Sequence, residues 1–371
     1  MSKRQVNGRS DQQKLIHKAF GKKVTRDKVL SQINSDPETK KLFDTFSEAD
    51  KERVIAFLAG EQTLQILYDK FFKKILDPEA TPERMESLLS AIYEERVEIV
   101  ASLPKEGIIF SEDGSQVVMD IIIRLSNGSI TTVEMQRLGF LFPGERSSCY
   151  LADMLIRQYE KVRSERGKDF NYRDLKDVNL IVIMETSSKE FRDVAPAYMH
   201  KREVIFDSGA KVKNLENVIY ISLDTYKERG DNEINSDLDA WLTFFTAEKP
   251  ADVLRLLNCY PEFLPMYQEI AEFRKKPEEV IGMFSEALRI MDRNTTKYMI
   301  DELHETITEQ LQTISDQSQT ISDQNQTISD QSQTISDQNQ TISDQNQTIS
   351  DQNLTIEKLR GRINELEQNV N

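Results

Sequence analysis

The sequence has few of the residues that cross-link small domains or bind transition metals. Its 371 residues include two cysteines, Cys149 and Cys259, and three scattered histidines, His17, His200 and His304. Two isolated cysteines exclude a disulfide framework and a cysteine-rich zinc site. The scattered histidines argue against a metal site built from imidazoles. We therefore expect a protein of a reduced compartment, the cytoplasm.

The sequence also lacks a long apolar run. Residues 1–11 are basic and polar, and no apolar stretch follows them that could act as a signal peptide or cross a membrane. Hydrophobic residues make up 38% of the chain and charged residues 30%. A chain of this length and composition can bury a sizeable core, and we expect more than one folding unit and no membrane partner.

The sequence lacks enough basic residues to balance its acids, with 48 Lys and Arg against 63 Asp and Glu and a formal net charge of −15. From Asp301 onward there are 13 acidic and three basic residues, a net charge of −10, so the other 300 residues carry only −5. The acidic total argues against non-specific coating of nucleic acid by the whole chain. It leaves room for a local basic face in the first 300 residues.

Two runs rich in β-branched residues, Val117–Leu125 and Ile130–Gln136, lie on either side of the turn sequence Ser126-Asn127-Gly128-Ser129. An Asn-Gly pair between such runs predicts a β-hairpin. If residues 126–128 form a three-residue loop with Gly128 in the left-handed conformation, Leu125 pairs with Ser129. This register places Asp120 opposite Glu134 on one face of the sheet, whereas a slip of one residue would separate them.

Two carboxylates that face each other at about 5 Å repel strongly unless a cation lies between them. A divalent metal ion would relieve this repulsion at Asp120 and Glu134. The alternative is a pair of acids on the solvent face of the hairpin.

The Asp120…Glu134-x-Gln136 arrangement resembles the PD-(D/E)XK nuclease superfamily, and more narrowly its transposase-like, recombination-promoting nucleases, in which glutamine often replaces the usual lysine. Three further segments resemble boxes of that family in the same order, and the resemblance covers roughly residues 64–247. They are Tyr68–Lys73 (the D-x-x-F-K box), Arg146–Tyr150 (the R-x-x-x-Y that starts a helix) and Leu238–Phe245 (the closing W-L-x-F helix).

The resemblance implies an α/β, restriction-endonuclease-like core with a mixed sheet flanked by helices. It implies that Asp120, Glu134 and the backbone carbonyl of Met135 hold Mg²⁺ or Mn²⁺, ions that prefer oxygen ligands. Asp69 is a candidate for an additional acid. For Asp69 the alternative of a helix-surface carboxylate beside lysines stays open.

Gln136 takes the place of a lysine that would neutralise charge on the phosphate. Glutamine can only donate a neutral hydrogen bond and orient the attacking water, so we expect a slow nuclease. Candidates for DNA phosphate contacts recur on one face of the following helix, and the alternative is a solvated basic helix that pairs with its own glutamates. These candidates are Arg146, Tyr150, Arg157 and Lys161.

The order of predicted elements suggests four parts. They are a helical N-terminal extension (1–60), the nuclease-like domain (61–247), a helical segment (248–299) and a heptad-repeat tail (300–371). Within the second part we expect helices over 63–76, 82–93 and 145–163, and strands over 107–110, 178–184 and 218–223. Trp241 and Phe245 are expected in the core.

The tail contains six consecutive units of Gln-Thr-Ile-Ser-Asp-Gln-Asn/Ser, beginning at Gln312. Isoleucines recur every seven residues from Ile300 to Ile363, which is typical of a left-handed coiled coil with isoleucine at position a. Position d is leucine at both ends and glutamine between. Because the middle heptads contain poor helix formers, a disordered polar tract is the alternative to a weak coiled coil joined at its ends.

The sequence therefore predicts a Mg²⁺- or Mn²⁺-dependent DNA endonuclease that hydrolyses phosphodiester bonds and assembles as a homo-oligomer through its heptads. Its setting would be recombination, mobile elements or phage defence. Two alternatives stay open: a nuclease-fold protein that has lost catalysis and acts as a coiled-coil interaction module, and a nuclease that acts on RNA.

Overall fold

A computed structural model describes residues 9–64, 69–103, 106–109, 116–118, 121–138, 143–230 and 233–368. The chain divides into two compact units, Met1–Met299 and Ile300–Asn371. Among the described helices, none carries an apolar stretch long enough to cross a membrane.

Within the described residues, six strands of the first unit form one mixed sheet in the order β1-β4-β5-β6-β8-β7. β5 pairs in parallel with β6, and β6 with β8, while the remaining pairs are antiparallel. This confirms the expected α/β class with a mixed sheet. The strands are β1 (Ile99–Ser102), β4 (Ile121–Leu125), β5 (Ile130–Leu138), β6 (Val178–Thr186), β7 (Met199–Lys201) and β8 (Glu216–Ser222).

The hairpin of β4 and β5 has the predicted register. Ile121 pairs with Val133, and the next three pairs follow in step to Arg124 and Ile130. Gly128 has φ +86°, and its N–H donates to the Leu125 carbonyl at 2.9 Å. Leu125 N–H donates to the Ser129 carbonyl at 2.9 Å, which closes the predicted three-residue loop.

The start of the predicted first arm belongs to another sheet. Gln116–Val118 forms a separate strand, β3, which pairs with β2 (Glu106–Ile109) in a two-stranded sheet. β4 begins at Ile121. The apolar run of the sequence therefore serves two sheets, which hydrophobicity alone could not indicate because both segments have the same composition.

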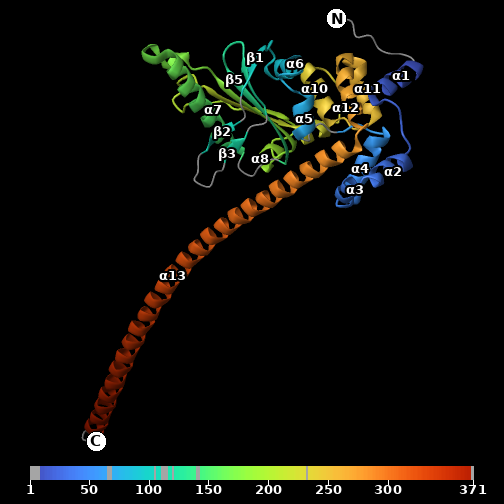
Figure 1. Ribbon diagram of the computed structural model, residues 1–371. Helices are drawn as coiled ribbons and strands as arrows, with labels where there is room; N and C mark the ends of the chain where they lie inside the picture. The colour runs from blue at the N-terminus through green and yellow to red at the C-terminus, as the bar shows by residue number, and fades with distance from the viewer. Residues whose placement is uncertain are drawn as a thin grey trace. The chain divides into compact units, whose positions relative to one another are not determined.

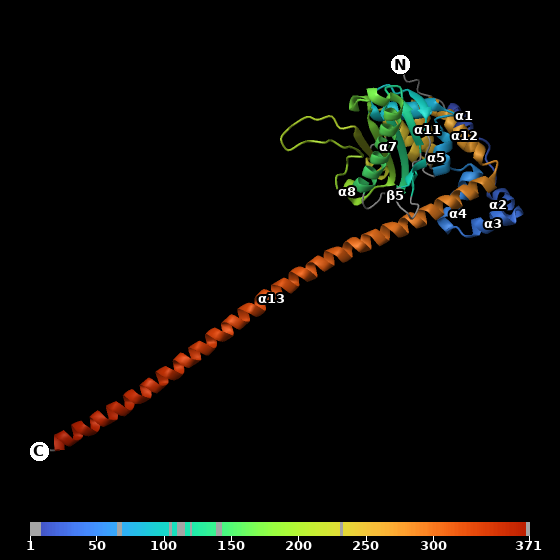
Figure 2. The same cartoon turned by 60° about the vertical axis from the view of Figure 1, so that its left-hand side comes forward.

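Each face of the large sheet is covered by helices (Figures 1 and 2). α7 (Pro143–Arg166) covers one face, where Tyr150, Leu151 and Met154 pack with even-numbered strand residues such as Ile122 and Val182. The odd-numbered strand residues belong to a second apolar cluster, shared with α5 (Asp69–Ile75), α6 (Pro82–Tyr93) and α10 (Asp237–Thr246). β6, covered on both faces, is the continuous apolar run predicted for a doubly buried strand.

The second apolar cluster extends into helices from both ends of the first unit. Val54, Phe57, Tyr267 and Phe284 are all nearly inaccessible to solvent and belong to it. The helices before residue 60 thus share a core with those after residue 248. They are α1 (Arg9–Phe20), α2 (Arg26–Ser35), α3 (Pro37–Asp44), α4 (Glu48–Ala59), α11 (Pro250–Cys259), α12 (Leu264–Phe273) and the beginning of α13 (Pro277–Gln368).

Other local predictions differ in how well they agree with the structure. The predicted helix 82–93 is α6 with the same ends. The helix predicted over 63–76 is described only as Asp69–Ile75, and Thr63 lies before it in a loop, where its N–H donates to the Glu248 carbonyl at 2.9 Å. Trp241 and Phe245 are buried, as expected. The short elements β1, β7, α8 (Lys189–Arg192) and α9 (Leu223–Glu228) were not anticipated.

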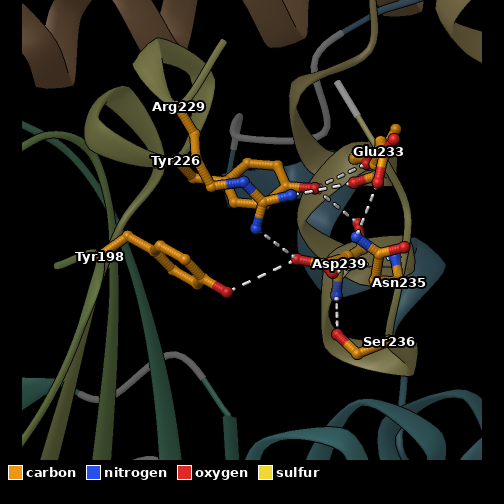
Figure 3. Close-up of polar contacts among 8 residues, drawn as sticks. Tyr198, Tyr226, Arg229, Glu233, Asn235, Ser236 and Asp239 are labelled. Atoms are coloured by element: carbon orange, nitrogen blue, oxygen red, sulfur yellow. Dashed lines mark hydrogen bonds and ion pairs between the residues drawn. The ribbon is translucent and has the colours of Figure 1, made fainter. Parts of the chain in front are cut away.

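A polar network joins the end of α9 to the start of α10 (Figure 3). Arg229 donates to Asp239 at 2.9 Å, and the Asp239 side chain is only 5% exposed. The hydroxyl of Tyr226 donates to the Asp239 carbonyl at 3.0 Å, and Ser236 accepts from the Asp239 N–H at the same distance, as an N-cap does. The Arg229 guanidinium lies 4.9 Å from the centre of the Tyr226 ring.

The second unit is part of α13, which is one continuous helix to Gln368 (Figure 1). Residues 300–368 are therefore helical, in agreement with the heptad pattern, whereas pairing with another helix stays a prediction. The apolar residues at position a are half exposed, for example Ile321 at 57% and Ile335 at 58%.

The Arg229–Asp239 ion pair should contribute substantially to stability. We expect Arg229→Leu to lower the free energy of unfolding by about 3 kcal/mol, because it leaves a buried carboxylate without its cation. The matched control is Arg255→Leu, which removes a pair with Asp252 whose side chains are 37% and 34% exposed, and should cost less than about 1 kcal/mol. Urea denaturation measures both, and equal losses would contradict the assignment.

Candidate functional site

Glu134 is a carboxylate buried on a sheet face. It lies on the central strand β5, pairs with Val182 of β6, and is 4% exposed. By alternation along the strand it shares the face of Ile130 and Thr132, the face that α7 covers. The hydroxyl of Thr132 is 3.5 Å from Glu134 Oε1, at the outer limit of a hydrogen bond. Glu134 is thus not an acid on a solvent face.

Gln136 follows two residues later on the same strand and face, and it is half-buried. Met135, between them, is on the opposite face, where its side chain packs against the larger apolar cluster. The spacing of Glu134 and Gln136 therefore directs a carboxylate and an amide to the same side of β5.

Two predicted acids cannot be placed at this site. Asp120 lies outside the described residues, so its pairing with Glu134 stays a prediction that rests on the observed pairs from Ile121 onward. Asp69 is the first residue of α5, but its side chain lies outside the description.

The first turns of α7 carry Arg146 and Tyr150 of the R-x-x-x-Y segment. The helix begins at Pro143, and proline suits the first position of a helix. The Arg146 guanidinium donates to the Tyr150 hydroxyl and lies 5.0 Å from the centre of its ring. Tyr150 is 5% exposed and packs on the face that carries Glu134. The buried Tyr150 ring therefore holds the Arg146 guanidinium beside the strands.

A second hydroxyl network holds this end of α7 to the sheet. The Tyr220 hydroxyl of β8 is 2.6 Å from Ser147 Oγ and donates to the Pro143 carbonyl at 2.9 Å. Burial raises the pKa of Tyr220, and its hydrogen bond to Ser147 partly opposes this shift. A pocket beside it is lined by Gly144, Ser147 and the consecutive basic residues His200, Lys201 and Arg202. These residues lie on or directly after β7, a strand that the sequence pattern did not predict.

The other two basic candidates on α7 differ from each other. The Nε atom of Arg157 lies 2.9 Å from Oδ2 of Asp153 in an ion pair, and Asp153 is fully buried. Lys161 is exposed and 3.9 Å from Glu165, in agreement with the alternative that it pairs along its own helix. Arg157 thus compensates a buried acid, a role that the sequence analysis missed. The signal was an aspartate among the apolar positions of α7.

Metal binding is compatible with the donor atoms of this region. Among the side chains that the structure describes, no three His, Cys, Asp or Glu residues converge on a common point. The buried Glu134 carboxylate, the Met135 carbonyl and the Gln136 amide oxygen are hard oxygen donors, which suit Mg²⁺ or Mn²⁺ rather than zinc or copper. The residues present therefore fit a magnesium-type ion, with Glu134 as the carboxylate that the structure places.

Comparison with known proteins gives one match. A family model described as a PD-(D/E)XK nuclease family transposase matches residues 66–303. No curated protein and no solved structure matches the chain. The matched segment contains the whole of β5 and α7 and ends at the start of the heptads.

Titration with Mg²⁺ or Mn²⁺ tests the metal site without any measurement of activity. At a metal concentration 100 times the Kd, binding should stabilise the folded protein by about 2.7 kcal/mol, seen as a rise in Tm. Glu134→Gln should abolish the rise. The matched control is Glu185→Gln on the neighbouring strand β6, where alternation places residue 185 on the opposite face. An equal rise in both variants would contradict the site.

Proposed function

The chain belongs to the PD-(D/E)XK nuclease family transposases, and we propose that it is a metal-dependent DNA endonuclease that hydrolyses phosphodiester bonds. The observation that supports this most is the buried carboxylate of Glu134 on the α7 face of β5, with Gln136 two residues later. A carboxylate in such a place is stabilised by a cation.

Glu134, Asp120 and the Met135 carbonyl would hold Mg²⁺ or Mn²⁺, with Asp69 as a further candidate ligand. When bound, such an ion lowers the pKa of water and stabilises negative charge on phosphate. Gln136 would orient the attacking water through a neutral hydrogen bond. Since glutamine cannot neutralise the phosphate charge as lysine does, the proposed enzyme is slow.

Arg146 and Tyr150 are the stronger candidates for DNA contact, because they lie on the same sheet face as Glu134. In the proposed complex, Arg146 reaches a phosphate oxygen while Tyr150 positions the guanidinium. Arg157 and Lys161 lie about two and three turns beyond Tyr150 along α7 and would contact more distant phosphates. Because Arg157 already compensates buried Asp153, its contribution is the smaller one.

The proposed setting is DNA recombination, a mobile element or phage defence in the cytoplasm, where Cys149 and Cys259 stay reduced. An RNA substrate is the second candidate, separated from the first by competition between DNA and RNA. If catalysis has been lost, the protein would act as an interaction module through α13.

We also propose that the heptads join copies of the chain. The line of residues at positions a and d from Ile300 to Val370, here called the seam, would extend roughly 105 Å as a helix. Its terminal heptads have both isoleucine and leucine, as at Ile356 and Leu359, whereas the middle heptads have glutamine at position d. Association should therefore depend mainly on the apolar ends.

Removal of either acid tests the active site. Asp120→Asn and Glu134→Gln should each abolish Mg²⁺-dependent nicking of plasmid DNA and leave the fold intact, because each removes a charge that holds the ion. Glu185→Gln is the matched control and should nick normally. Full activity in either of the first two variants would sink the assignment.

Gln136 allows a test of whether its neutral side chain limits the rate. Gln136→Lys should stay active with a kcat about tenfold higher, because a cation near the phosphate stabilises developing charge. Gln136→Ala should lower kcat by about 100-fold. Single-turnover nicking measures both variants. If Gln136→Ala cleaves at the normal rate, the residue is structural.

The assembly proposal is tested at the apolar end of α13. Replacing Ile356, Leu359, Ile363 and Leu366 with serine should yield a monomer by light scattering. Serine at the outer positions Glu357, Lys358 and Asn364 is the matched control and should preserve the oligomer. Deleting residues 312–353 removes whole heptads without breaking the a/d phase, so oligomer state and nicking should both survive. An oligomer that withstands the first replacement would assign assembly to the first unit.

A further inference from the structure

The repeats of α13 expose one apolar stripe along the whole second unit. Six isoleucines at position a are each 53–59% exposed. Apart from glutamine, the remaining residues of the repeat are threonine, serine, asparagine and aspartate, which are mediocre or poor helix formers. A long helix of this composition needs a partner that covers the stripe, because helices in proteins owe most of their stability to packing. The isoleucines are Ile314, Ile321, Ile328, Ile335, Ile342 and Ile349.

The aspartate of each repeat accepts a hydrogen bond from its own helix, away from the isoleucines. In each unit the glutamine at position f donates to the aspartate at position c four residues later, as Gln319 does to Asp323 at 2.9 Å. The same bond joins Gln312–Asp316, Gln326–Asp330, Gln333–Asp337, Gln340–Asp344 and Gln347–Asp351.

The positions beside the seam are neutral as well. Threonines at position g, such as Thr320 and Thr327, bond to their own helix through the carbonyl four residues earlier. The face that contains the isoleucines therefore has no charge in the six repeats. Two identical copies can approach along it without repulsion, so a second copy of this chain fits the stripe.

We propose that the occupant of this face is one second copy of the chain, parallel and in register, in a two-stranded coiled coil. This inference rests on the assembly proposed above and adds the orientation, register and number of chains.

The glutamines at position d decide the orientation. In a parallel, in-register pair, layers of a against a alternate with layers of d against d, so isoleucine meets isoleucine and glutamine meets glutamine. A glutamine amide has both donors and an acceptor, so a facing pair can satisfy each other. In an antiparallel pair, a packs against d, and each layer would press an amide such as that of Gln324 against an isoleucine. An amide buried without a partner is unfavourable.

The ends of the seam decide the number of chains and the register. The combination of isoleucine at a and leucine at d, found at Ile300 and Leu303 and again at Ile356 and Leu359, favours two strands. A shift by one repeat would leave the middle layers unchanged but would place leucine against glutamine at each end. The sequence also has Arg362 at position g and Glu367 at position e of the next heptad, the two positions that face each other in a parallel pair.

The parallel orientation has a consequence for the nuclease. The heptads start at Ile300, directly after the first unit ends at Met299. In a parallel pair both first units are attached at the same end of the coil. Two active sites can then act on one DNA molecule, so cuts in both strands would arise from a single encounter.

Cysteine cross-linking tests the arrangement in the full-length protein with Cys149 and Cys259 replaced by serine. Gln317→Cys and Gln352→Cys place single thiols at position d near opposite ends of the repeats. Each should form a disulfide-linked dimer with itself under mild oxidation, with at least a tenfold excess over the control. The matched control is Gln319→Cys, at position f, which faces outward.

Three other outcomes would each contradict one part of the proposal: the orientation, the number of chains or the assembly itself. Disulfides that form only when Gln317→Cys protein is mixed with Ile349→Cys protein, whose thiol is at position a near the other end of the repeats, would show an antiparallel pair. A mass of three or more chains by light scattering would overturn the two-stranded state. A monomer would overturn the assembly itself. The same cross-links should form in a Glu134→Gln background, so a failure of the proposed catalysis would not alter the result.

Discussion

The left-handed turn at Gly128 is the constraint on which the site depends. With φ at +86°, this residue lets Ser126–Gly128 close the hairpin so that Leu125 pairs with Ser129. A side chain there would be strained, and its Cβ would lie 3.1 Å from Lys176. Side chains alternate along a strand, so this turn alone determines that residue 134 faces α7. A shift by one residue would exchange the carboxylate for Val133 and place an apolar side chain where the acid now lies.

The register matters because the central strands of the sheet are buried on both faces. β5 and β6 lie between two apolar clusters, one shared with α7 and the other with helices from both ends of the first unit. A polar residue on either strand is therefore held in an apolar environment in which its partners matter. Among the residues that the structure describes, Glu134 and Asp153 are the buried carboxylates on the α7 face. Arg157 forms an ion pair with Asp153, and Glu134 shares its sheet face with Gln136 two residues later.

In the second unit, the side-chain hydrogen bonds and the exposed isoleucines occupy different positions of the heptad. Glutamine–aspartate bonds four residues apart satisfy the outer face within the helix itself. They are made within one helix and leave the isoleucine stripe exposed for the association that we propose. A repeat of seven residues also keeps this division when units are lost or gained, because the phase of the stripe does not change.

The sequence by itself determined the features that depend on near neighbours along the chain. These include the Gly128 turn and hairpin register, the ends of α6, the doubly buried β6 and the phase of the heptads, since period and turn chemistry are local properties. Only the tertiary structure decided which segments meet. The apolar run over 117–125 was divided between two sheets, β7 was added at the sheet edge, and the helices before residue 60 joined the core of those after 248. The predicted basic face of α7 was split, because Arg157 turned to a buried aspartate while Lys161 stayed in solvent. Such choices depend on desolvation and on contacts between residues far apart in the chain, which no local pattern records.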